Sequence, residues 1–222
     1  TLYLSARPQL VDYVAVLALV IFLRRLVDGR RPVLALLAIG VLTVLWVNLH
    51  AAALLGVAMV GASLFLTFLK RTTRRRSGWL FAAFLIITFC SLINPYGAGL
   101  LTQTMQVKAQ SVDVVEWQPF DPADPLQLVL FAIGLLGFAV AARRRDPIFA
   151  AVLIVGACGS IAAMRILPIF VLLALPVLAS SVSHELVIRY FVSRRKMLAR
   201  GASVFLVIAS AIALYNLPFF GR

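Results

Sequence analysis

The chain has 222 residues, of which 63% are hydrophobic and only 13% are charged. A soluble domain has about half apolar and about a quarter charged residues, so this composition excludes an ordinary soluble domain and predicts a membrane protein. The formal net charge of +13 comes from cations that flank apolar segments. We therefore assign this charge to membrane topology and to contact with membrane lipids, and we do not expect nucleic acid as a partner.

Apolar segments along the chain are long enough for membrane-spanning helices, which need about 20 residues each. The expected spans are residues 9–23, two spans within 32–69 that are joined by a turn at 46–50, and then 79–93, 126–142, 148–164, 166–182 and 202–217. We thus predict an all-α, polytopic transmembrane helix bundle of about eight spans. It forms a single transmembrane domain over residues 1–222.

Positive residues gather in four clusters that follow every other apolar segment. The clusters are Arg24/Arg25/Arg30/Arg31, Lys70/Arg71/Arg74/Arg75/Arg76, Arg143/Arg144/Arg145 and Arg189/Arg194/Arg195/Lys196/Arg200. Short loops rich in Lys and Arg stay on the cytoplasmic side of a membrane. The pattern therefore predicts a multi-pass protein with both termini and an acid-rich loop at 94–125 on the non-cytoplasmic side.

The turn at Trp46–His50 places two polar side chains, Asn48 and His50, between apolar helices. Burying them without hydrogen-bond partners would cost free energy. Two interpretations remain open. In the first, this is an interfacial turn with Trp46 as a membrane-interface anchor and a solvated His50. In the second, His50 faces a cavity, where it binds an anionic or hydroxyl group or moves a proton.

The loop at 94–125 carries two groups of candidate site residues. Tyr96 lies in an Asn-Pro-Tyr-Gly turn at the depth expected for lipid headgroups. Further along, Glu116 precedes Trp117, and Asp113 comes just before them. A carboxylate beside an aromatic ring suits a sugar site, because the carboxylate binds or deprotonates hydroxyls and the ring packs on the pyranose. The same residues could equally form a loop that lies on the membrane.

Two cations on the predicted outer side run against the topology signal. Arg7 precedes the first span, and Arg165 lies in the short turn between the spans at 148–164 and 166–182. Such an arginine snorkels, forms an ion pair or binds an anion such as a lipid phosphate or pyrophosphate. Asp12 lies one turn into the first span, where it pairs with Arg7 or lines a cavity.

Four motifs occur in order along the first half of the chain: Arg7-Pro8-Gln9, Trp46-x-Asn48-x-His50, Asn94-Pro95-Tyr96-Gly97 and Glu116-Trp117-Gln118-Pro119. Together they resemble a family of bacterial multi-span proteins in the GT-C glycosyltransferase superfamily. Ala51 departs from the glycine expected after the histidine. The usual catalytic acid of the superfamily would precede Thr1, so we expect the chain to be the C-terminal part of a longer protein.

The resemblance implies a sugar transferase of the bacterial plasma membrane that uses a polyprenyl-phosphate-linked sugar at the extracytoplasmic face. It implies catalytic roles for Glu116, Asp113 and His50, and substrate-binding roles for Arg7, Gln9, Asn48, Tyr96, Trp117 and Arg165. No cofactor is expected. The superfamily sometimes uses a divalent metal, but the acids present are too few to name ligands. A non-catalytic membrane subunit, an O-antigen polymerase or ligase, and a transporter of lipid-linked sugars remain alternatives.

Overall fold

The computed structural model describes residues 9–70, 77–110 and 114–181. Its helices are α1 (Gln9–Asp28), α2 (Pro32–Leu49), α3 (Ala53–Leu69), α4 (Ser77–Cys90), α5 (Gly99–Gln110), α6 (Pro125–Arg143), α7 (Pro147–Ala162) and α8 (Leu167–Ala179), with the 3-10 turns η2 (Val115–Trp117) and η3 (Met164–Ile166). Over these residues the structure contains no strand, which confirms the all-α class. The expected span at 202–217 lies outside the described residues.

The helices correspond closely to the apolar segments of the sequence. Helices α1–α4 and α6–α8 cover the first seven expected spans, with ends that differ by a few residues. The exception is the segment at 94–125, which we expected to be a loop and which contains α5 and η2. Helix α5 mixes leucines with Gln and Thr, and its 12 residues lack the continuous apolar run by which the other helices were recognised.

Two of the described helices, α2 with 18 residues and α6 with 19, are long and apolar enough to cross a membrane by length and composition. The other apolar helices, among them α3, α4 and α7, are shorter. Only 28% of the apolar window in α2 and 17% of that in α6 is buried. Side chains such as Leu37 and Leu136 are therefore exposed, whereas the core helix of a soluble protein would bury most of its apolar residues.

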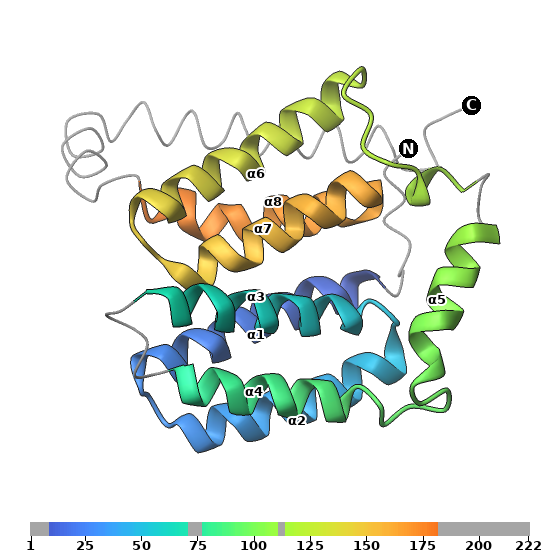
Figure 1. Cartoon of the computed structure of the whole chain (residues 1–222). Helices are drawn as coiled ribbons and strands as arrows, with labels where there is room; N and C mark the ends of the chain where they lie inside the picture. Colours follow the sequence, from blue (N-terminus) through green and yellow to red (C-terminus); the bar gives the residue numbers. More distant parts are fainter. Residues whose placement is uncertain (1–8, 71–76, 111–113, 182–222) are drawn as a thin grey trace, which may run out of the picture. The chain divides into compact units, whose positions relative to one another are not determined.

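The helices pack as two groups, which meet mainly where α3 packs against α7 and also where α1 contacts α7 and α8. Helices α1–α4 pack on one another, α6–α8 form the second group, and α3 packs against α7. Figure 1 shows these helices side by side, with α5 running across them at the end where α2 finishes and α3 begins. The chain is at this end after α2, after α4 and after α7 (Figure 1).

Glycines allow a close approach between α6 and α8. A Cβ atom on Gly134 would collide with the ring of Phe170, and one on Gly137 would lie 2.9 Å from the Cα of Ala174. Small residues at such contacts let two helix backbones come close enough for extensive van der Waals packing. The contact fixes the position of α8, and therefore that of the η3 turn directly before it.

Several basic residues, among them Arg24, Lys70 and Arg145, lie at the helix ends opposite α5 (Figure 1). Arg24, near the end of α1, donates from Nη1 to Oδ2 of Asp146 at 2.7 Å. Asp146 also caps α7, because its Oδ1 accepts from the backbone amides of Ile148 and Phe149. At the end of α3, the Nζ of Lys70 donates to the carbonyl oxygen of Arg145 at 2.5 Å. These contacts connect the two helix groups at the basic end.

We predict that Gly134→Ala lowers the free energy of unfolding by about 1–3 kcal/mol, because the added methyl group overpacks the contact with Phe170. Gly40→Ala is the matched control: it also lies within a helix, but its Cβ would meet Ile86 at an ordinary 3.4 Å. Thermal unfolding in detergent measures both. Equal stability of the two variants would contradict this account of the α6–α8 interface.

A second prediction concerns the start of α6, where Asp124 is the N-cap. Hydrogen bonds from the side chain of Gln127, and from the backbone amides of Gln127 and Leu126, hold the pKa of the Asp124 carboxyl below its usual value. This pKa is lower in the folded state than in the unfolded state. The stabilisation is therefore complete above the unfolded-state pKa and disappears as pH falls through the folded-state pKa.

We accordingly expect Asp124→Ala to destabilise the protein at neutral pH and to have little effect at the acid end of the titration. Unfolding curves recorded from neutral pH downwards test this. The wild type should lose its advantage over the variant as the pH falls. An advantage that is independent of pH would show that the charge of the cap contributes nothing.

Candidate functional site

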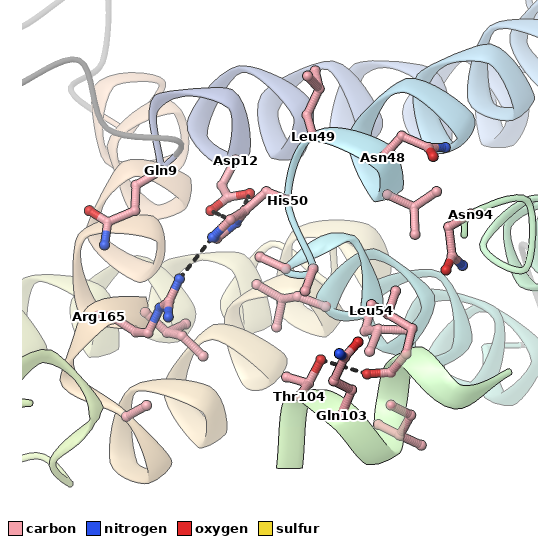
Figure 2. A pocket seen from close by; sticks show the side chains of 18 of the residues that line it. Gln9, Asp12, Asn48, Leu49, His50, Leu54, Asn94, Gln103, Thr104 and Arg165 are labelled. Carbon is pink, nitrogen blue, oxygen red and sulfur yellow. Dashed lines mark hydrogen bonds and ion pairs between the residues drawn. The ribbon is translucent and has the colours of Figure 1, made fainter. Parts of the chain in front are cut away.

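Polar residues from five parts of the chain meet at the end of the helices where α5 lies. They come from the start of α1, the α2–α3 turn, the segment after α4, η2 and η3. Together with α5 these parts line a pocket of about 840 Å³. Figure 2 shows Gln9, Asp12, His50 and Arg165 on one side of this pocket and Asn48 and Asn94 on the other, with Gln103 and Thr104 on the α5 side.

Asp12, His50 and Arg165 form a continuous hydrogen-bonded chain. The Nδ1 of His50 lies 2.9 Å from Oδ1 and 2.8 Å from Oδ2 of Asp12. On the other side of the ring, Nη2 of Arg165 lies 3.1 Å from Nε2 of His50. The side chain of Asp12 is 3% exposed and that of His50 is 19% exposed. The carboxylate is therefore almost fully buried, and Asp12 also contributes to the pocket wall, as one of the two expectations for this residue had it.

The contacts fix the tautomer of His50. A guanidinium group can only donate hydrogen bonds, so Nε2 of His50 must accept from Arg165. The proton of the neutral ring then lies on Nδ1, which donates it to Asp12. Both ring nitrogens are engaged, and the chain carries a negative charge at Asp12, a neutral ring, and a positive charge at Arg165.

Trp46 supports the buried end of this chain. Its Nε1 donates to Oδ1 of Asp12 at 2.7 Å, and the residue is 1% exposed. The interpretation of Trp46 as a membrane-interface anchor is therefore wrong, because the indole turns inward to satisfy a buried charge. A Cβ on Gly56 would lie 2.9 Å from the indole ring. The tryptophan thus packs tightly on α3 and has little room to move.

The η2 turn contributes an aromatic ring and a carboxylate. The guanidinium of Arg165 stacks over the ring of Trp117 at 4.3 Å from its centroid, which is a cation–π contact. Glu116 accepts from Nε2 of Gln9 at 2.8 Å. The backbone amide of Met164 donates to the carbonyl oxygen of Gln118 at 2.8 Å, so η2 is held against the turn that carries Arg165.

The asparagines on the other side of the pocket hold the backbone in place. Nδ2 of Asn48 donates to the carbonyl oxygens of Val44 and Ile93, at 2.8 and 2.7 Å, and thereby joins the end of α2 to the segment after α4. Oδ1 of Asn94 accepts from the backbone amide of Tyr96 at 2.8 Å. Tyr96 is 59% exposed and lines the pocket.

Between these polar groups the pocket wall is apolar. It includes Leu54 and Leu55 from α3, Leu101 and Met105 from α5, and Ile169 from α8. A ligand that fills the pocket therefore meets a cation at one end and hydrocarbon along its length. This combination suits an amphiphile with an anionic head group.

The structure brings together most of the predicted site residues. Gln9, Asn48, His50, Tyr96, Trp117 and Arg165 all line the pocket, and Glu116 is joined to it through Gln9. Arg7 and Asp113 lie outside the described residues. Sequence reasoning missed that Asp12 is the partner of His50, that Trp46 donates to Asp12, and that α5 forms a wall. An acid within an otherwise apolar span was the one available signal for the first of these.

Within the described part of the chain, no group of three or more His, Cys, Asp and Glu side chains could hold a metal ion. Comparison with known proteins gives no further guide: no protein-family model, no curated protein and no solved structure matches the chain.

We predict that Trp46→Phe lowers the free energy of unfolding by about 1.5–3 kcal/mol, because the buried carboxylate of Asp12 loses a hydrogen bond. Trp79→Phe is the control, since Trp79 is 40% exposed and should tolerate the change within about 0.5 kcal/mol. Chemical or thermal unfolding in detergent compares the two. If both substitutions proved equally mild, the indole would not be the anchor of Asp12.

Proposed function

We propose that the chain is a membrane glycosyltransferase-like protein that transfers a sugar from a polyprenyl-phosphate donor to an acceptor at the extracytoplasmic face. One observation carries the proposal. Residues from all four GT-C-like motifs (Gln9, Asn48 and His50, Tyr96, and Trp117) line the same pocket as Arg165. They are far apart in the sequence, and their meeting at a pocket with a cationic end and apolar walls suits a lipid-linked phosphate.

The proposed topology is that of a multi-pass protein of the bacterial plasma membrane, in which α1–α4 and α6–α8 cross the bilayer and an eighth span follows at 202–217. The separation of charge supports this arrangement. Described cations such as Arg24, Lys70 and Arg143 lie at one end of the helices, and the pocket lies at the other. By the positive-inside rule, the pocket and the segment at 94–125 then face the outer side, as do both termini.

In the proposed reaction, Arg165 binds the phosphate of the donor and stabilises the charge that develops as it leaves. The bond between the anomeric carbon and the phosphate oxygen breaks, and a bond to the acceptor hydroxyl oxygen forms. The carboxylate of Glu116, oriented by Gln9 at 2.8 Å, takes the hydroxyl proton. The apolar wall from α3 and α5 holds the first prenyl units. Arg7 and Asp113 complete the proposed site.

Transfer assays test this proposal. The native full-length protein is reconstituted in liposomes with a panel of radiolabelled polyprenyl-phosphate sugars, and incorporation of label into acceptor is measured. We expect Glu116→Gln to lower the transfer rate about 100-fold or more, because the amide can still accept from Gln9 but cannot take a proton. Arg165→Gln should lower it about 100-fold as well.

Arg30→Gln is the matched control, because it removes one cation from the opposite end of the helices and should leave transfer unchanged. Wild-type transfer rates in both Glu116→Gln and Arg165→Gln would exclude the proposed roles. Binding of the lipid-linked sugar with no transfer by the wild type would instead favour a transporter or a non-catalytic subunit.

A further inference from the structure

The Asp12–His50–Arg165 chain suggests how the head-group end of the pocket works, given the lipid-phosphate ligand of the proposed function. We infer that Asp12, His50 and Trp46 are positioning residues that aim the guanidinium of Arg165 into the pocket. His50 serves in this arrangement as a hydrogen-bond acceptor for Arg165. It is neither the acid nor the base of the reaction.

The occupancy of the imidazole ring is the first argument. Nδ1 of His50 is engaged by the carboxylate of Asp12, and Nε2 is engaged by Arg165. A histidine that acts as a base needs a lone pair directed at the substrate. Here the lone pair of Nε2 is directed at the guanidinium and not at a substrate. Asp12 orients the imidazole ring, and the ring in turn orients Arg165.

The second argument is the rigidity of the hydrogen-bonded series formed by Asp12, His50 and Arg165. Asp12 is 2% exposed and receives hydrogen bonds from both His50 and Trp46. The indole of Trp46 packs against Gly56. At the other end, Trp117 lies beneath the guanidinium of Arg165. Arg165 is therefore held both at its edge and on its face, which reduces the side-chain entropy that it loses when a ligand binds.

The remaining hydrogen-bonding capacity of Arg165 is the third argument. A guanidinium has five N–H donors, and one contact to His50 leaves most of them for a ligand. Among the described residues, Arg165 forms no ion pair with a carboxylate. The charged groups on neighbouring elements include Asp12, which is hydrogen-bonded to the other side of the imidazole, and Glu116 of η2. A phosphate head group supplies the anion that this cation can still bind.

Two substitutions of His50 separate positioning from proton transfer. The Gln side chain can place its amide oxygen near the position of Nε2 and still accept from Arg165. The Asn side chain is shorter and reaches only the position of Nδ1. Neither residue titrates, so a loss that both share reports an acid–base or ring-specific role. A loss confined to His50→Asn reports the missing acceptor.

The experiment measures binding of farnesyl phosphate and of its neutral counterpart, farnesol, to the full chain in nanodiscs. We expect the wild type to prefer the phosphate by about 10-fold or more. His50→Gln should keep this preference within about 1.5-fold, whereas His50→Asn and Arg165→Gln should lose about 10-fold of it. Farnesol affinity should be unchanged in all variants, which also shows that they are folded.

Equal loss in His50→Gln and His50→Asn, or full preference in both, would overturn the inference and leave the proposed function standing. A wild type that does not distinguish the two ligands would overturn both. Normal phosphate preference without sugar transfer would exclude only the proposed function. Should His50→Asn also lose farnesol binding, Trp46→Phe replaces it: the preference should fall about 3-fold, and an unchanged preference would overturn the inference.

Discussion

The site depends on how one buried charge, the carboxylate of Asp12, is satisfied. A carboxylate in an apolar environment is strongly unfavourable unless it is paired and hydrogen-bonded. Its partners come from different elements, since Trp46 belongs to α2 and His50 to the turn after it. Through His50 the chain of contacts reaches Arg165 in η3. Satisfying Asp12 therefore brings together α1, the α2–α3 turn and the α7–α8 connection at the same end of the helices.

Apolar packing alone would not place these groups so closely. Apolar side chains can pack in many arrangements of nearly equal free energy. Van der Waals attraction favours those in which the helix backbones lie closest together. Gly134 and Gly137 set the approach of α8 to α6, and Gly56 gives room to the indole of Trp46. The glycine contacts fix helix positions, and the polar chain then selects the register in which donors and acceptors meet. The glycine contacts thus lie at the two ends of the hydrogen-bonded series, at Trp46 and in α8, which follows Arg165. The hydrogen bonds between Asp12, His50 and Arg165 connect these ends.

The sequence predicts most helices well because each of them corresponds to a contiguous apolar run, which needs no knowledge of the tertiary structure. Long apolar runs indicate α2 and α6, and the basic clusters show where helices end. It also points to His50 and Arg165, because polar groups between apolar helices need a reason to be there. Their pairing is a different matter. His50 and Arg165 are separated by 115 positions in the sequence, and only the packing of α3 on α7 and of α1 beside them makes the two meet.

The same reasoning explains why α5 and the role of Trp46 were not predicted. Helix α5 has a polar sequence, and its apolar residues matter only because the pocket lies beside them. Tryptophan is common at membrane interfaces, so position alone favoured the interface for Trp46. The deciding factor is the carboxylate of Asp12, 34 positions earlier in the sequence. A buried carboxylate needs a hydrogen-bond donor. Which residue donates depends on the packing of the helices, and the sequence alone does not show it.

A neutral imidazole between an acid and an arginine has a consequence for the charge that the pocket presents. A direct, bidentate pair between Arg165 and Asp12 would use the planar fork that recognises phosphate, and it would place the two charges at their closest approach. With His50 between them, Arg165 gives up one donor. The attraction between the charges also falls as their separation grows. Asp12 thus still lowers the free-energy cost of placing the charge of Arg165 in a largely apolar wall. Most N–H donors of the guanidinium remain for an anion. A ligand then binds a cation that is already partly buried and already oriented.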